Sequence, residues 1–384
     1  MIILLLPYLI VFALSSLLLR LFQRVYNSVY IQDDLSENRR RVGKIIYCLF
    51  GCIAMFPVIA MYGLRYGIGT DYFGYEEIFD TLHTAPFIRY LRGFLNSEDA
   101  YYVEPAYYFL NKLLPSYRVL LWILGLFLLL LVCIALKSYS RKINFALALF
   151  IYLSTQFIYA MNGVRFAVAL CLVMLAYHEL IKDRTFRFVV IILIATMFHR
   201  SVLLCMAMYF LKQYRFREVN SLRNIVLFVL IMSFPLAGGA FLKIAEKIPY
   251  FSRYFSKSIY SASESMSSGW MWMFHVVPPL LPLILLAWRE ISEEKDTKIL
   301  FRICMMEIPF RMLGLYNTWY TRFTRCSQIA QVLFIPLVLD RVKKKGTRVT
   351  LYLYYIVWFS IYFAYYAIVN DRGDSLPYTW IFSH

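Results

Sequence analysis

The chain has 384 residues, of which 61% are hydrophobic and 18% are aromatic, and its mean hydropathy is +0.61. A soluble domain of this size would need far more polar surface, so the composition excludes a soluble globular protein. The formal charge of +17 would suit nucleic-acid binding. Most of the Lys and Arg, however, lie in short connections between apolar runs, which indicates membrane topology and predicts no nucleic-acid partner.

Apolar runs recur along the whole chain and are continuous rather than alternating, which predicts transmembrane helices and not strands. We therefore expect an all-α polytopic membrane protein, with residues 1–384 forming one integral membrane domain of about 10–12 transmembrane helices or half-helices. The first run lacks a basic leader and a cleavage site, so it is interpreted as a retained helix and not as a signal peptide. The expected segments are 2–20, 43–62, 118–136, 143–161, 163–181, 186–198, 200–211, 223–242, 271–288, 298–317, 323–340 and 349–369.

Basic residues cluster in alternate connections, and the positive-inside rule places those connections in the cytoplasm. They lie between 20 and 44, 137 and 142, 182 and 187, 212 and 223, 289 and 298, and 341 and 348. This orientation leaves two long outer loops, 63–117 and 243–270. Segments 186–198 and 200–211 are each too short to cross a bilayer alone. A broken hairpin that turns near His199 keeps the basic cluster after it on the cytoplasmic side.

The first outer loop opens with Arg65-Tyr66-Gly67-Ile68-Gly69-Thr70-Asp71-Tyr72-Phe73-Gly74-Tyr75. One interpretation is a turn that caps a helix beginning after Asp71. The alternative is a sugar site, in which Tyr72 and Tyr75 stack on pyranose rings while a carboxylate holds hydroxyls. Farther along, Glu104 precedes a proline that suits the first turn of a helix. Glu104 is either a helix-start anion or a group that binds or deprotonates a sugar hydroxyl.

Four charged residues sit at the predicted outer ends of helices. Arg165 opens an apolar helix, where the helix dipole disfavours a cation, so an anion is expected nearby. His199 lies at the predicted hairpin turn and is the side chain best suited to proton transfer near neutral pH. Arg322 and Arg325 are three residues apart and suit a diphosphate, because guanidinium donors match its oxygens.

Other patterns are interpreted as structural. Glu307 and Arg311 are four residues apart and are expected to pair on one helix face. The seven cysteines lie in or beside apolar segments, form no CxxC motif and are interpreted as small apolar residues. The sequence contains no HExxH, Walker A or nucleophile-elbow motif. No metal and no cofactor is therefore expected.

Taken in order, these motifs resemble the EpsG family, which is related in role to Wzy-type polymerases of O-antigen, capsule and exopolysaccharide. The resemblance rests on Arg65–Tyr75, Glu104-Pro105 with Tyr107-Tyr108, Asn162-Gly163-x-Arg165-Phe166-Ala167, and Phe198-His199-Arg200-Ser201. It covers most of the chain and weakens after about residue 340. The family often has glutamine where this chain has Phe166, and a small or different polar residue at Arg200. These departures concern the detailed roles of that region.

The resemblance implies a metal-independent glycosyltransferase of GT-C-like fold, a polysaccharide polymerase. It would join polyprenyl-diphosphate-linked oligosaccharide repeat units at the outer face of a bacterial inner (plasma) membrane. Both donor and acceptor would be lipid-linked, with membrane lipids, a chain-length regulator and a flippase as further partners. The base is expected among His199, Asp71 and Glu104. The diphosphate ligands are expected to be Arg65, Arg165, Arg322 and Arg325, and the sugar ligands Tyr72, Tyr75 and Tyr320.

Two alternatives remain open from the sequence. One is an O-antigen ligase or another lipid-linked sugar glycosyltransferase, which would add a unit once instead of building a ladder of lengths. The other is a flippase or transporter for the same lipid-linked unit. Transporters tend to carry matched broken helices in paired repeats, whereas the sequence indicates one break.

Overall fold

The computed structural model describes residues 2–30, 36–96, 101–139, 142–213, 271–313, 321–369 and 374–383. Within these ranges the chain is helical and contains no β-strand, apart from one isolated bridge between Arg65 and Trp380. The predicted all-α polytopic class is thus confirmed.

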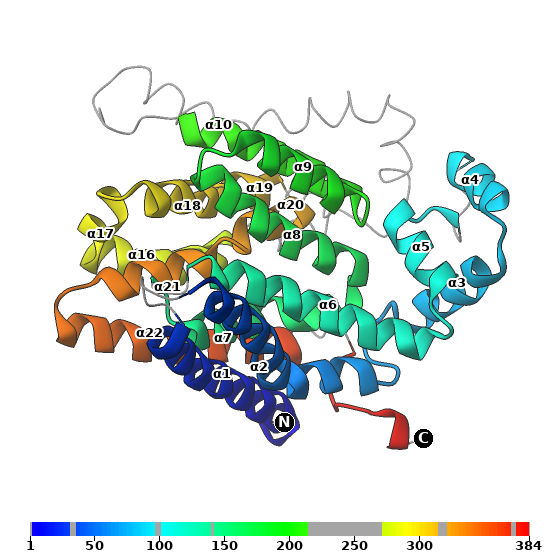
Figure 1. Ribbon diagram of the computed structural model, residues 1–384, viewed down its shortest axis with the longest axis horizontal. Helices are drawn as coiled ribbons and strands as arrows, with labels where there is room; N and C mark the ends of the chain where they lie inside the picture. The colour runs from blue at the N-terminus through cyan, green and yellow to red at the C-terminus, as the bar shows by residue number, and fades with distance from the viewer. Residues whose placement is uncertain are drawn as a thin grey trace.

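Six helices among the described residues are long and apolar enough to cross a bilayer (Figure 1). They are α1 (Ile2–Tyr30), α2 (Glu37–Leu64), α6 (Tyr117–Lys137), α7 (Phe145–Asn162), α8 (Val164–Ile181) and α22 (Lys345–Ala364). The apolar window of the last one continues to Ile368 through the π-helical turn η6 (Tyr365–Val369). The outward faces of α1, α2, α6 and α22 carry exposed Leu, Ile, Val or Phe side chains, as expected of helices that contact lipid, whereas α7 and α8 are mostly buried inside the bundle.

The remaining helices are short. At one end of the molecule, set apart in Figure 1, are α3 (Tyr72–Thr84), α4 (Phe87–Leu95) and α5 (Pro105–Leu113). The others are α9 (Thr185–Thr196), η2 (Arg200–Ala207), α10 (Met208–Gln213), α15 (Trp272–His275), α16 (Val277–Leu286), α17 (Trp288–Ser292), α18 (Lys295–Met305), α19 (Glu307–Leu313), α20 (Thr321–Gln328), α21 (Gln331–Arg341) and η7 (Ile381–Ser383).

Local capping explains where two of the long helices begin. The Ser116 side chain accepts a hydrogen bond from the Val119 backbone N–H at 3.3 Å and starts α6. Asn144 accepts from the backbone N–H groups of Ala146 and Leu147 and starts α7. Each cap satisfies donors that would otherwise be left open in the first helical turn.

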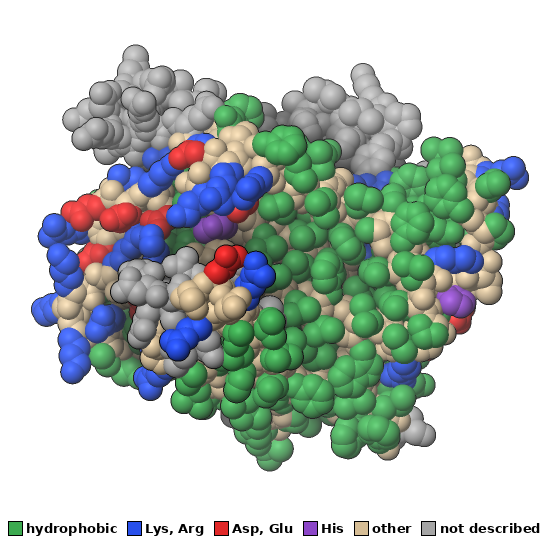
Figure 2. Space-filling view, in the orientation of Figure 1, with side chains coloured by type: hydrophobic (Ala, Val, Ile, Leu, Met, Phe, Trp, Pro, Cys, Tyr) green, Lys and Arg blue, Asp and Glu red, His purple; other side chains and the backbone are tan. Residues whose placement is uncertain are grey.

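The predicted cytoplasmic connections meet at one end of the bundle, which we call the basic end. There Asp183, between α8 and α9, pairs with Lys212 at 2.7 Å and also with Lys295. Asp296 pairs with Arg341 at 2.9 Å. In Figure 2, Lys and Arg side chains gather over α17, α18 and the neighbouring turns, while apolar side chains predominate over the middle of this face. The connections that the charge pattern grouped together are therefore close in space.

The broken hairpin near His199 is confirmed. Helix α9 has 12 residues and ends just before His199. The chain then returns through the 3-10 helix η2, which packs against α9, and α10. Lys212 near the end of α10 bonds Asp183 near the start of α9, so both ends of the hairpin lie at the basic end.

Three other predicted spans are not continuous helices, and here the prediction was wrong. Segment 271–288 breaks between α15 and α16, segment 298–317 breaks between α18 and α19, and segment 323–340 breaks between α20 and α21. Buried polar residues flank the breaks: His275, Glu307, Gln328 and Gln331. Their side chains bond one another across the bundle, which favours irregular backbone at these points. The predicted span 223–242 and the outer loop 243–270 lie outside the described residues.

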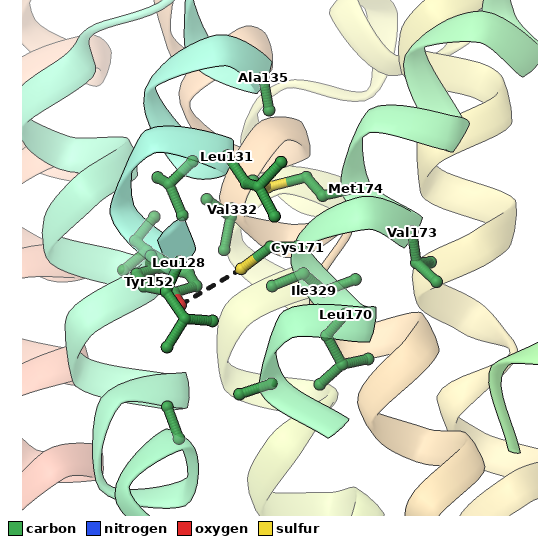
Figure 3. Packing of buried hydrophobic residues seen from close by; sticks show 14 of the residues in the cluster. Leu128, Leu131, Ala135, Tyr152, Leu170, Cys171, Val173, Met174, Ile329 and Val332 are labelled. Atoms are coloured by element: carbon green, nitrogen blue, oxygen red, sulfur yellow. Dashed lines mark hydrogen bonds between the residues drawn. The ribbon is translucent and has the colours of Figure 1, made fainter. Parts of the chain in front are cut away.

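The centre of the bundle is closely packed where α6, α7, α8 and the start of α21 meet. Leu128, Leu131, Cys171, Ile329 and Val332 lie together there (Figure 3). The Tyr152 hydroxyl and the Cys171 sulfur are 3.4 Å apart, and the dashed line in Figure 3 marks this contact. Of the six cysteines whose side chains are described, five are buried. They act as small core residues, as the sequence indicated.

Candidate functional site

The candidate site lies at the end of α8 opposite the basic end, about 27 Å away along an 18-residue helix. Its foundation is the α7–α8 junction. The Asn162 side-chain oxygen accepts hydrogen bonds from the Thr70 hydroxyl and the Asp71 backbone N–H, both at 2.9 Å. Gly69 has φ +102, and a Cβ there would lie 2.8 Å from the Met161 carbonyl oxygen. Only glycine allows this close approach, which holds Asp71 beside the start of α8.

Glu104 is the centre of the site. One carboxylate oxygen accepts from Arg165 Nη1 at 2.6 Å, and the other accepts from both Arg200 Nε at 3.3 Å and the Arg200 backbone N–H at 3.2 Å. The Glu104 side chain is 6% exposed, and the two arginine side chains are 20% and 21% exposed. The Ala106 N–H donates to the Met197 carbonyl, which fixes the start of α5 against the hairpin turn. The anion expected near Arg165 is therefore supplied by the protein itself.

The charge state of Glu104 follows from this pairing. Burial by itself would raise the pKa of Glu104, but the positive charges of Arg165 and Arg200 outweigh it and hold the pKa below its usual value. Glu104 is thus an ionised carboxylate with both oxygens engaged. This geometry disfavours the predicted role as a base and favours a role in orienting the two arginines.

Asp71 and His199 have different environments. Asp71 is an exposed residue at the N-terminal boundary of α3 and makes no capping bond with its side chain. Partial burial raises the pKa of its carboxyl group, and Arg165 and Arg322 offset this only in part. The His199 Nδ1 is 2.7 Å from the Ser201 hydroxyl. Burial and the surrounding arginines hold the pKa of His199 below its usual value, so its imidazole is neutral at pH 7 and has an acceptor nitrogen.

The arginines predicted to hold a diphosphate are not all in one place. The positive charges of Arg165 and Arg322 both lower the pKa values of Asp71 and of His199. These two arginines therefore belong to the site. Arg325 points into the bundle, where its Nη1 donates to the Thr155 carbonyl at 3.0 Å and to Gln328 at 2.9 Å. Arg65 is fully buried.

The tyrosines predicted to stack on sugar rings are packed inside the protein. Tyr72 is 0% exposed and Tyr75 is 7% exposed, so neither presents an open ring face. The Tyr75 ring centre lies 5.8 Å from the Arg165 guanidinium carbon, and the Tyr107 ring lies at 5.7 Å. These rings stabilise the arginine by cation–π interaction. Tyr320 lies outside the described residues.

The sequence motifs contained further site residues whose roles were missed. Arg200 was noted as a departure from the family pattern, yet it is the second partner of Glu104, and its guanidinium carbon lies 4.0 Å from the Tyr102 ring centre. Asn162 was noted within its motif, yet it is the residue that positions Asp71. The available signal was proximity in sequence to a predicted site residue, since Asn162 lies three positions before Arg165 and Arg200 directly follows His199.

A second polar cluster lies inside the bundle at the three unexpected helix breaks. His275 Nε2 is 2.5 Å from the Tyr366 hydroxyl, and its Nδ1 is 2.9 Å from the Tyr362 hydroxyl. Glu307 pairs with Arg311 at 2.8 Å, which confirms the predicted i, i+4 pair, and accepts from Gln331 at 3.2 Å. Nothing in the sequence pattern drew attention to His275.

Comparison with known families decides the relationship. The model of the EpsG family matches residues 48–380, a range that includes every residue of the site. The chain belongs to the EpsG family. Comparisons with curated proteins and with solved structures find no match. Among the described residues, no three His, Cys, Asp or Glu side chains form a group that could hold a metal ion.

Proposed function

We propose that this EpsG-family protein is a polysaccharide polymerase that joins polyprenyl-diphosphate-linked oligosaccharide repeat units. The reaction is glycosyl transfer, without a metal, at the periplasmic or extracellular face of a bacterial inner membrane. The products are O-antigen, capsule or exopolysaccharide chains. Family membership supports the class of reaction, and the site's charges support the substrate.

The observation that carries the proposal is the pair of arginines on one buried carboxylate. Arg165 and Arg200 share Glu104, and Arg322 and Asp71 are close by. Three guanidinium groups face two carboxylates, so the site keeps a net positive charge in a partly desolvated place. Such a site favours an anionic ligand, and guanidinium donors match diphosphate oxygens.

The reaction assigns a role to each group. The acceptor hydroxyl loses its proton to a base and attacks the anomeric carbon of the donor sugar. The bond from that carbon to the diphosphate oxygen breaks, and the polyprenyl diphosphate leaves with the electron pair. Arg165, Arg200 and Arg322 stabilise the leaving charge. The base is Asp71 or His199, and Glu104 orients Arg165 and Arg200.

The test uses purified full-length protein in detergent with lipid-linked repeat units, and a gel that resolves chain length. The wild-type protein is expected to produce a ladder. Arg165→Ala should abolish the ladder, and Arg165→Lys should restore little of it, because lysine lacks the bidentate donors. Arg289→Ala is the matched control, since Arg289 is an exposed arginine at the basic end that pairs only locally with Glu293. A normal ladder from Arg165→Ala would refute the assignment.

The same assay separates the alternatives. A ligase adds its unit once and gives a single product, not a ladder. One observation supports the transporter alternative: three broken helices converge on the buried polar cluster around His275. Detergent removes the two sides of a membrane, so a pure transporter produces no new glycosidic bond there. In cells, a polymerase deletion should leave single repeat units on the carrier lipid.

A further inference from the structure

Arg65 is the largest fully buried side chain described in the protein. It follows the last residue of α2. Its Nη1 donates to the Tyr62 carbonyl at 3.3 Å, and its guanidinium carbon lies 3.9 Å from the Tyr62 ring centre. The side chain is 0% exposed, so bulk water does not solvate its charge.

The other two nitrogens of Arg65, Nε and Nη2, have no hydrogen-bond partner and are buried. These two atoms lie on the same edge of the planar guanidinium group. That edge is the fork that binds two oxygens of one carboxylate or phosphate group with parallel hydrogen bonds. These two unpaired donors therefore match one specific kind of ligand.

Another buried arginine shows how this protein satisfies such a fork when it uses its own residues. Arg311 is 5% exposed, and both its Nε and its Nη2 lie 2.8 Å from Glu307 Oε1. Among the described residues, no carboxylate pairs with Arg65 in this way. Glu104 is already engaged by Arg165 and Arg200. A buried charge without a partner is strongly unfavourable, so Arg65 requires a counter-charge.

The surroundings of Arg65 are closed by the C-terminal segment 374–383. The Tyr66 N–H donates to the Thr379 carbonyl at 3.1 Å, and the Thr379 hydroxyl donates to the Tyr66 carbonyl at 2.6 Å. Arg65 itself forms a backbone bridge with Trp380. Asp374, the acidic residue within this segment, is exposed.

Two features add to the case for an anion at this place. Arg118 Nη1 donates to the Arg65 backbone carbonyl at 2.9 Å, and the positive charges of Arg118 and Arg65 both act on the Tyr72 hydroxyl. Two hydroxyls from the neighbouring elements, those of Tyr72 and Ser375, are also buried without a partner. Both residues are 0% exposed, and a hydroxyl can donate to an anion.

We propose that Arg65 holds an oxyanion, a carboxylate or phosphate group, in a closed site beneath the C-terminal segment 374–383. The ligand is either a free ion or the phosphate of a lipid, since both offer the same pair of oxygens. The site is independent of the proposed polymerase reaction, because its ligand balances a buried charge and is not consumed.

The test measures the melting temperature of full-length protein in dodecyl maltoside, a detergent without phosphate, by tryptophan fluorescence. Sodium phosphate, sodium acetate and sodium chloride are titrated at constant ionic strength, and a separate arm adds short-chain phosphatidic acid. Phosphate and small carboxylates released on denaturation are quantified in parallel. We expect a saturable rise of roughly 2–4 °C at ten times the dissociation constant for phosphate or acetate but not for chloride.

Arg65→Lys keeps the charge but removes the fork, so its melting temperature should not respond to the oxyanions. Arg65→Met should behave likewise if it folds. Arg311→Met is the matched control, because its fork is internally filled, and its response to oxyanions should match that of the wild type. A response to inorganic phosphate identifies a free ion, and a response only to phosphatidic acid identifies a lipid phosphate. A wild-type protein that neither responds nor releases an oxyanion overturns the proposal, as does an Arg65→Lys variant that titrates like the wild type.

Discussion

Replacing Glu104 by glutamine tests the centre of the site most directly. The change keeps the shape of the side chain and removes the charge that Arg165 and Arg200 share. Breaking a buried ion pair from one side typically costs about 3–5 kcal/mol, because the partner charges stay unpaired. The two arginine side chains are 20% and 21% exposed, so water recovers part of this. We expect a loss of about 2–3 kcal/mol.

The assay is thermal unfolding of the purified protein in detergent, combined with ladder formation across pH. A loss of this size should lower the melting temperature by about 5 °C. The amount of ladder formed should fall at every pH. The decline of activity at low pH should remain, since Glu104 positions the arginines and does not take the proton. A double-mutant cycle with Arg200→Gln should give a coupling free energy of about 1–3 kcal/mol. A Glu104→Gln protein that melts within about 1 °C of the parent would refute the reasoning.

Three further predictions follow from the geometry. If Asp71 is the base, activity falls as pH drops through its raised pKa, because the base works only when ionised. Asp71→Asn should then abolish ladder formation, and a normal pH profile from that variant would exclude this role. Gly69→Ala should cost about 1–3 kcal/mol of stability, because φ is +102 and the new Cβ meets a backbone oxygen. Gly74→Ala, where the Cβ meets nothing within 4 Å, is the control in thermal unfolding. Single cysteines at Asp183 and Lys212 should be labelled by an impermeant thiol reagent from one side of the membrane and a cysteine at Asp71 from the other. Labelling of Asp183 and Lys212 from opposite sides would contradict the hairpin.

Three features could be predicted from the sequence: the all-helical fold, the grouping of the basic connections at one end of the bundle, and the hairpin turn near His199. Apolar runs determine which segments enter a bilayer, and short basic connections share one side, so both signals are local. The hairpin followed from length, because 186–198 and 200–211 are each too short to cross. The breaks near His275, Glu307 and Gln328 were not predicted. Each lies within an apolar run long enough to span, and their polar side chains find partners only from other helices.

The ordered motifs determined the family and named the site residues Asp71, Glu104, Arg165 and His199, since each is a charged or titratable group within or beside one of those motifs. Only the tertiary structure decided how these groups pair. Glu104 meets Arg165 across 61 positions and Arg200 across 96 positions of the chain, separations that no local pattern encodes. The same packing turned Arg325 into the bundle, buried Tyr72 and enclosed Arg65. Charge and hydropathy are properties of single residues, whereas pairing and burial depend on which helices pack together.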